Sequence, residues 1–357
     1  MKQNKKRIQG LNGLRVYAIA MIVACHVGAL ADTAGGIGNK IFFTLSGFLA
    51  YYSIRGIKNW KDIFGFYWKK ILRIVPVFWV IILIVWRMFP GTFSLRDLTS
   101  DNSLVLNCLF IKNRGHLWFL QHLMLMYLFT PVLWYINVLI ESVLMKLNNN
   151  KIVANIFSAI GLIAIAILEK TFLTSDIIAL SGEGSHSQFQ IWMFIMGFAT
   201  AILGEVVNGF VIKDSNSKFM KIGKAVSAIY ATAVVALLFI SVVPVVYERG
   251  ALWLLGNDYL RAILSCGIFL FFLIFEENVV TRILDSKVLN QLSVLSFGIY
   301  LWHFYFISLF RTESGLHNFI FNFFISLCLS IFTYIVVERN VSRLSKKVRS
   351  ILGFVNP

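Results

Sequence analysis

The chain has 357 residues, of which 58% are hydrophobic and only 14% are charged, and its mean hydropathy is +0.76. A soluble domain is about a quarter charged and could not bury this much apolar surface, so the composition excludes a soluble fold and predicts a protein embedded in lipid. The net charge of +16 would attract nucleic acid, but the basic residues lie between apolar runs and form no single basic face, so we expect no nucleic-acid partner.

Apolar runs predict an all-α fold, a polytopic transmembrane helix bundle of about ten spans. A helix needs about 20 largely apolar residues to cross a bilayer. The longest gap between runs, 90–116, fits no soluble domain, so we expect a single integral-membrane domain over residues 1–357. Ten runs approach the required length: 12–31, 38–54, 72–89, 117–140, 152–168, 188–208, 225–246, 259–275, 292–311 and 317–337.

The distribution of lysine and arginine predicts the orientation of these spans. With the N-terminus in the cytoplasm, the inside segments carry 23 of these residues and the outside segments carry 9. Cytoplasmic loops are normally enriched in positive charge, so we expect both termini to be cytoplasmic. The basic N-terminus and the apolar run after it resemble a signal peptide, but we interpret the run as a retained first span.

The four cysteines show no CxxC spacing, and we expect neither a disulfide framework nor a metal site. Cys25 could act as a nucleophile beside His26. Adjacent helical residues diverge by about 100°, which argues against that arrangement.

The first span carries two ionisable residues, and such groups are expensive at bilayer depth. Arg15 and His26 are 11 residues apart, which is close to three helical turns and roughly 16 Å of rise. The two side chains therefore share a face, with a fixed cation near the cytoplasm and a titratable imidazole toward the outside. The simpler explanation is that Arg15 extends to the inner headgroups and that His26 makes an interhelical hydrogen bond.

A basic stretch begins the third span. Lys70 and Arg73 are three residues apart on one helical face at its cytoplasmic end. Arginine and lysine both bind phosphate, so this pair is a candidate phosphate site, although a positive-inside anchor would look the same.

Histidines and aromatic residues recur in two later segments. His116 and Trp118 are expected at the outer membrane interface, with His122 deeper. Tyr300 and His303 lie three apart near mid-membrane, as a hydrogen-bonded pair or as part of a site.

Two further polar positions have simple structural explanations. Glu338 ends the last span at the inner surface, where it could pair with Arg339. Ser46 lies beside Gly47 and suits close helix packing.

Six segments in series resemble the membrane acyltransferase family three, whose members O-acylate bacterial surface glycans and related substrates. The match covers about residues 11–343 and consists of LNGLRVYAIAMIVACHVG, FFTLSGFLA, FYWKKILRIVPVFW, HLWFLQHLMLMYLFTPVL, LSVLSFGIYLWHF and VVERNVSR. The sequence departs from this family at four positions. Many members have Asp at Asn12, acidic residues at Leu123 and Met124, and Pro at Asn340. Some members also carry an extracytoplasmic hydrolase-like domain, which we do not expect in this chain.

The resemblance implies acyl transfer from cytoplasmic acyl-CoA, most often acetyl-CoA, to a hydroxyl of a surface polysaccharide or its lipid-linked precursor, of the O-antigen or capsule type. It implies a multi-pass protein of the bacterial inner (cytoplasmic) membrane. On this interpretation His26 is the general base, Arg15 anchors the donor, and Lys70 and Arg73 bind the CoA phosphates. The remaining candidates line the cavity or stand nearby: Trp118, His122, Tyr300, His303, Ser46, His116 and Glu338.

Three alternatives stay open at this stage. A glycan exporter or flippase could use intramembrane Arg and His equally well, although the paired repeats common in transporters are not visible. An acyltransferase could act on a small molecule instead of a polymer. A receptor or scaffold without chemistry would leave the Arg15 and His26 register as a coincidence.

Overall fold

The computed structural model describes residues 8–57, 59–100, 102–112, 115–173, 191–211, 218–250, 257–307 and 312–352. Regular structure in these ranges is helical, apart from one isolated bridge between Ser94 and Ser103. The α-helices are α1 (Leu11–His26), α2 (Thr33–Ile54), α3 (Trp60–Met88), α4 (Leu104–Cys108), α5 (Trp118–Asn148), α6 (Lys151–Leu168), α7 (Ile191–Val211), α8 (Lys218–Ile240), α9 (Pro244–Glu248), α10 (Asp258–Ile274), α11 (Val279–Leu284), α12 (Lys287–Trp302), α13 (Gly315–Thr333) and α14 (Arg339–Leu352). Shorter 3-10 turns are η1 (Gly115–Leu117) and η5 (His303–Phe306), and π-helical turns are η2 (Glu169–Leu173) and η6 (Tyr334–Glu338).

The all-α prediction is confirmed, whereas the span count is confirmed only in part. Six helical stretches in the described ranges are long and apolar enough to cross a membrane: Trp60–Met88, Gly115–Leu147, Lys151–Thr171, Ile191–Asn208, Lys218–Ile240 and Gly315–Val348. The other four predicted spans coincide with the helices α1, α2, α10 and α12, which do not meet that criterion. The parts of two runs at 188–190 and 308–311 lie outside the described residues. The orientation of the termini stays a prediction.

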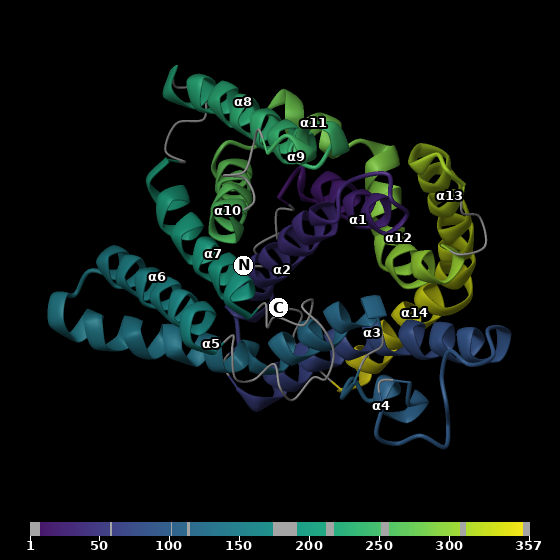
Figure 1. The fold of residues 1–357 in the computed structure, drawn as a ribbon. Helices are drawn as coiled ribbons and strands as arrows, with labels where there is room; N and C mark the ends of the chain where they lie inside the picture. The colour runs from purple at the N-terminus through teal and green to yellow at the C-terminus, as the bar shows by residue number, and fades with distance from the viewer. Residues whose placement is uncertain are drawn as a thin grey trace.

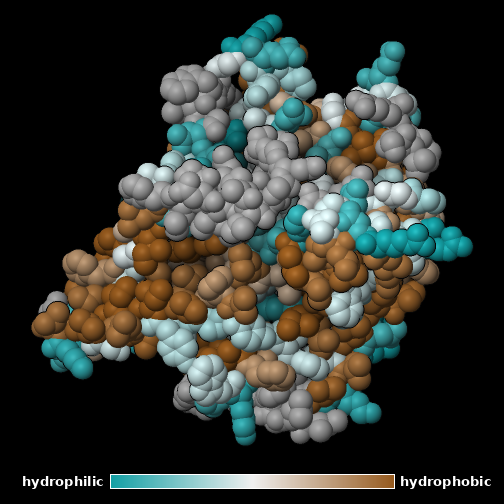
Figure 2. All heavy atoms as spheres, turned by 60° about the horizontal axis from the view of Figure 1, so that its bottom comes forward, coloured by the Kyte–Doolittle hydropathy of each residue, from teal (hydrophilic) through white to brown (hydrophobic). Residues whose placement is uncertain are grey.

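Large apolar side chains cover much of the outer surface. Leu139 on α5 is 64% exposed and Ile229 on α8 is 69% exposed. Figure 2 shows apolar residues over a broad area across one face, with hydrophilic residues gathered toward its upper and lower edges. A surface of this kind is stable against hydrocarbon and not against water.

Two glycines allow the central helices α2 and α7 to touch. A Cβ atom added to Gly47 would lie 1.9 Å from the Phe194 carbonyl oxygen, and one added to Gly197 would lie 1.9 Å from the Thr44 oxygen. Close backbone contact through small residues is a common way for membrane helices to associate. The glycine of the LSGFL segment therefore fixes the α2–α7 crossing. Figure 1 shows α1 and α2 inside the bundle, with α7 and α10 on one side and α12 and α13 on the other.

Helix α1 ends earlier than the sequence predicts. The predicted span reaches residue 31, but the helix stops at His26 and the chain turns at Gly28, where φ is +74°. The amide of Ala29 bonds to the Ala24 carbonyl at 2.8 Å, as in a glycine-terminated helix. His26 is thus the last residue of α1 and lies at the edge of a loop.

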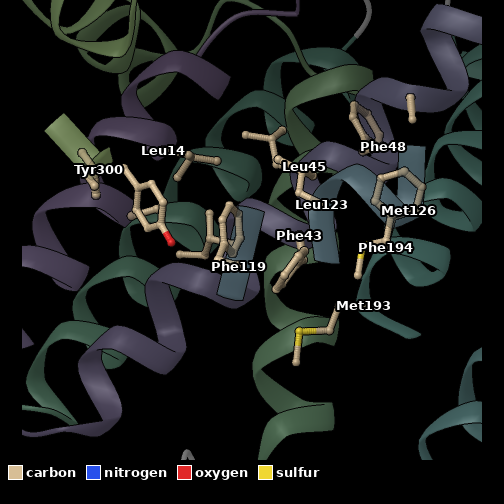
Figure 3. Close-up of a cluster of buried hydrophobic side chains, with 14 of the residues drawn as sticks. Leu14, Phe43, Leu45, Phe48, Phe119, Leu123, Met126, Met193, Phe194 and Tyr300 are labelled. Carbon is tan, nitrogen blue, oxygen red and sulfur yellow. The ribbon is translucent and has the colours of Figure 1, made fainter. Parts of the chain in front are cut away.

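A core of aromatic and apolar side chains fills the space between α2, α5, α7 and α12 (Figure 3). The rings of Phe43 and Phe119 are 4.4 Å apart, and Phe119 lies 5.4 Å from Tyr300. Leu123 belongs to this core, and Met124 packs against it. The two positions where many similar proteins carry acidic residues therefore serve apolar packing in this chain.

Candidate functional site

His26 meets a second histidine from the opposite end of the chain. Its Nδ1 lies 2.8 Å from Nε2 of His303, which begins the 3-10 turn after α12. The two rings are almost parallel, at 5°, with their centroids 5.0 Å apart. The hydrogen bond therefore runs close to both ring planes, which is favourable geometry.

The partners of His303 determine how protons are arranged along this pair. Nδ1 of His303 lies 2.6 Å from the Tyr300 carbonyl oxygen, which can only accept a hydrogen bond, so this nitrogen carries the proton. In the uncharged ring Nε2 is then an acceptor, and His26 must donate to it from Nδ1. The same assignment leaves the lone pair of uncharged His26 on Nε2, the nitrogen that faces away from His303. The Asn322 side chain also donates to the His303 carbonyl at 2.9 Å and ties the turn to α13.

His116 belongs to the same site, and its expected place at the outer membrane interface stays a prediction. Gly115 has a φ of +55°, and the 3-10 turn that follows directs His116 inward, where it is 5% exposed. Its ring lies 5.1 Å from His303 and stacks on Phe304 at 4.6 Å. The Tyr300 hydroxyl donates to the His116 carbonyl oxygen and holds this turn against α12. We refer to His26, His303 and His116 as the histidine site.

Trp118 and His122 lie one turn apart on α5 beside this site. Nδ1 of His122 donates to the Trp118 carbonyl at 2.7 Å, and the two rings meet edge to face at 5.4 Å. Trp118 also lies 6.1 Å from Phe43. Both residues therefore connect to the histidine site through the aromatic core, by way of Phe43, Phe119 and Tyr300.

Three cations gather around Tyr127 near the other end of α1. Nζ of Lys70 lies 4.2 Å above the Tyr127 ring, and the charges of Arg73 and Arg15 also act on the Tyr127 hydroxyl. These residues come from α3, α5 and α1. Arg15 and His26 thus mark two polar regions along one helix, roughly 16 Å apart by helical rise. We refer to Arg15, Lys70 and Arg73 with Tyr127 as the cation cluster.

Ser46 and Glu338 lie with the cation cluster and not with the histidine site. The Ser46 hydroxyl bonds to Tyr127, and its role as a residue that lines the substrate cavity stays a prediction. Glu338 closes the π-helical turn after α13, and its carboxylate acts on Arg73. One of its oxygens is buried and meets no hydrogen-bond donor among the described residues. The expected pairing of Glu338 with Arg339 is replaced by this interaction across to α3.

A third polar group joins α2, η2 and α10. The Asp258 carboxylate pairs with Lys40 at 2.8 Å and with Lys170 at 3.2 Å. Lys170 also lies 4.8 Å above Trp192. Because one carboxylate holds two largely buried lysines, this group connects three elements.

Sequence reasoning identified the two regions but not all their members. Tyr127, Phe304 and Asn322 were not predicted, and the Asp258 group was not foreseen either. The only sequence signal for Tyr127 and Asn322 is the presence of a tyrosine or an asparagine inside an apolar run. The pairing of His26 with His303 joins residues 277 positions apart, which no local pattern reveals.

The described residues contain no group of three or more His, Cys, Asp or Glu side chains placed to hold a metal ion. The cysteines are free thiols, and the thiol of Cys25 donates to the Asp32 carbonyl at 3.2 Å.

Comparison with known proteins points to acyltransferases both by family and by relatives. The family model described as the acyltransferase domain of acyltransferase family three matches residues 8–339. A protein of Staphylococcus aureus strain COL, provisionally named an O-acetyltransferase, is 24% identical over 344 residues, which cover 86% of this chain and 52% of the relative. A relative with the same provisional name from strain MSSA476 is 23% identical with the same coverage. The chain therefore spans about half the length of the curated relatives it matches. No solved structure matches the chain.

Proposed function

The chain belongs to acyltransferase family three, and from this premise we propose that it transfers an acyl group, most simply acetyl, from cytoplasmic acyl-CoA to a hydroxyl group. The acceptor we propose is a cell-surface polysaccharide or its lipid-linked precursor, of the O-antigen or capsule type. The provisional names of the relatives support an oxygen acceptor and an acetyl group. The long apolar helices support a multi-pass membrane location, which we propose to be the inner membrane.

The hydrogen-bonded pair of His26 and His303 is the observation that carries the proposal. A sugar hydroxyl is a weak nucleophile until a base removes its proton, and a positioned base contributes about 10² to 10⁴ in rate. His26 donates to His303 through Nδ1, and this bond leaves the basic lone pair of its ring on Nε2, the nitrogen away from His303. When Nε2 accepts a proton, the positive charge is stabilised by His303, which is itself held by the Tyr300 carbonyl. A base oriented by a third group is the arrangement on which activated nucleophiles depend.

The reaction follows from this geometry. Nε2 of His26 takes the proton of the acceptor hydroxyl while the hydroxyl oxygen attacks the thioester carbonyl carbon. A tetrahedral intermediate forms, its carbon–sulfur bond breaks, and the thiolate of CoA takes the proton back from the His26 imidazolium. The products are an O-acyl ester and free CoA, and we propose that the transfer is direct.

The cation cluster supports the donor side of the proposal. CoA carries several phosphate charges, and Arg15, Lys70 and Arg73 converge on one point near the predicted cytoplasmic end of α1. Arginine binds phosphate through two parallel hydrogen bonds, and lysine adds a point charge. With phosphates held there, the flexible pantetheine arm would extend along α1 toward His26.

Cells that lack the gene provide the test, complemented with the wild-type chain, His26→Gln or His317→Gln. His317 is an exposed histidine that stacks on Phe321, so its replacement is the matched control. We expect mass spectrometry to show that surface glycan loses an acyl group without the gene. The wild-type chain and His317→Gln should restore it, and His26→Gln should not.

Isolated membranes separate the proposal from the exporter alternative. Membranes with the wild-type chain should release CoA from acetyl-CoA when surface glycan stripped of its ester groups is added. An exporter would change how much glycan reaches the surface without consuming acetyl-CoA. Unchanged acylation in cells that carry His26→Gln would disprove the role of His26.

A further inference from the structure

His116 is a buried imidazole that the proposed chemistry has not used. His116 is 5% exposed. Among the described residues, neither of its ring nitrogens meets a partner with the geometry of a hydrogen bond. The Leu301 backbone interacts with the ring but does not meet that geometry. Buried polar groups are nearly always paired, because leaving a donor or an acceptor unmade costs free energy. An exception at this position points to a group that arrives with a ligand.

The surroundings of His116 indicate where that ligand lies. The Phe304 ring stacks on His116 at 4.6 Å and meets the His26 ring edge-on at 5.8 Å, so both imidazoles border the same ring. His303 also contacts both of them, at 5.1 Å from His116 and 5.0 Å from His26. Phe304 is 40% exposed, so this corner of the bundle reaches the surface. His116 and the base therefore stand on two sides of one small region.

The backbone of His116 is held in place by hydrogen bonding and by the turn at Gly115, and its ring contributes packing contacts. Gly115 adopts a left-handed conformation, and the Tyr300 hydroxyl binds the His116 carbonyl. The residue that orients the turn also supplies, through its own carbonyl, the hydrogen bond that orients His303. One tyrosine thus sets the placement of both histidines, while neither ring nitrogen of His116 meets the geometry of a hydrogen bond among the described residues.

We propose that His116 is the oxyanion donor of the site. Its ring N–H binds the carbonyl oxygen of the acyl donor as that oxygen becomes negative in the tetrahedral intermediate. The role divides the chemistry between two imidazoles: His26 moves the proton and His116 stabilises the charge. An imidazole N–H can donate to an oxyanion while uncharged, so it does not have to compete with His26 for a proton. This inference rests on the proposed acyl transfer.

Two substitutions with opposite properties test the role. His116→Phe keeps an aromatic ring against Phe304 but has no N–H, whereas His116→Gln loses the ring and keeps an amide donor. If His116 donates to the oxyanion, His116→Phe should lower kcat about 10²- to 10³-fold, and His116→Gln should lose less. If His116 serves only packing, His116→Gln should lose more kcat than His116→Phe.

The assay uses purified full-length chain with acetyl-CoA and surface polysaccharide from which ester groups have been removed. The KM for acetyl-CoA should change less than twofold in both variants. The melting temperature of His116→Phe should equal or exceed that of the wild type, because an unpaired buried polar group is gone. His317→Phe is the control and should match the wild type. Should His116→Phe not fold, His116→Met, which also lacks an N–H, takes its place.

The outcomes separate this inference from the proposed function. Wild-type kcat in His116→Phe, together with an inactive His26→Gln, overturns the oxyanion role alone. Activity retained in His26→Gln overturns the role of His26 as the base, whereas failure of the wild-type chain to release CoA from acetyl-CoA overturns the proposed function itself. A low kcat in His116→Phe together with a melting temperature below that of the wild type would assign His116 to packing and would also reject the proposal.

Discussion

The two ends of α1 carry different kinds of polar side chain. Around Arg15 the neighbouring groups are two basic side chains, Lys70 and Arg73, which act on one phenol. Around His26 the neighbours are imidazoles and aromatic rings, joined by hydrogen bonds and anchored by the backbone. An arginine, which never loses its charge, suits a ligand that is always charged, whereas an imidazole suits a step that moves protons. One helix therefore separates binding of the donor from the chemistry, and substitutions at the two ends should change different kinetic constants.

The largest effect is expected for His303→Phe, which removes the acceptor of the His26 bond without touching the proposed base. His26 would lose its fixed tautomer, and kcat should fall about 10²- to 10⁴-fold, with little change in the KM for acetyl-CoA. Steady-state kinetics on purified protein measure both constants. The matched control is Asn322→Ala, which loses one bond to the same turn and should cost far less. A His303→Phe enzyme with normal kcat would mean that His26 does not need the hydrogen bond to His303.

Asp258→Asn should have the next largest effect, on stability and not on acyl transfer. Lys40 and Lys170 would lose their shared carboxylate, and removing one partner of a buried ion pair costs about 3 to 5 kcal/mol. Asp258 is about a quarter exposed, so we expect the lower end of that range, seen as a lower melting temperature in detergent. Glu141→Gln is the comparison, because its partner Lys151 is 72% exposed and the pair contributes little. Equal melting temperatures for the two variants would contradict the structural role of Asp258.

Arg73→Gln tests the other end of α1. The loss of a charged hydrogen bond to phosphate costs about 1.5 to 3 kcal/mol, which is about a 10- to 100-fold rise in the KM for acetyl-CoA. The kcat value at saturating donor should stay within a few fold. Acetyl-dephospho-CoA lacks one of the phosphates of acetyl-CoA. If Arg73 binds that phosphate, the KM values of the variant and the wild type for acetyl-dephospho-CoA should differ less than their KM values for acetyl-CoA. Arg282→Gln, on the exposed side of α11, is the control and should leave both constants unchanged. A normal donor KM in Arg73→Gln would remove this residue from the donor site.

Glu338→Gln should have the smallest effect and the opposite sign. Its carboxylate acts on Arg73 and so competes with any phosphate that binds there. Removing the charge should lower the KM for acetyl-CoA a few fold, at most about 1 kcal/mol of binding free energy. The measurement is the donor KM at low and high salt, because the gain should shrink as salt screens the charges. A raised KM would show that Glu338 helps to position Arg73.

Much of this arrangement could be predicted from local patterns. The register of Arg15 and His26 along one helix, the basic pair Lys70 and Arg73, and the all-α fold follow from helical periodicity and apolar runs. These features depend on neighbours in the sequence, and the structure places Arg15 and His26 in two polar regions of the same helix.

The rest depends on contacts that join distant segments. His26 meets His303 only because α1 stops early at a glycine turn and α12 ends in a 3-10 turn beside it. His116 points inward because Gly115 has a left-handed backbone, which a sequence pattern of outer-interface aromatics does not show. Ser46 and Tyr127 pair across α2 and α5, so their membership in the cation cluster is a property of helix packing.

His26 donates to His303, and His303 donates to the carbonyl of residue 300; we refer to these three groups as the histidine relay. Its last acceptor is a peptide carbonyl, whereas many enzymes use a side-chain carboxylate in this place. A carboxylate can be protonated by acid or deleted by mutation, but the carbonyl of residue 300 has no ionisation of its own and survives any substitution of the tyrosine side chain. Evolution can vary the third member of this relay only by reshaping the end of α12, and that constraint ties the orientation of the base to the fold itself.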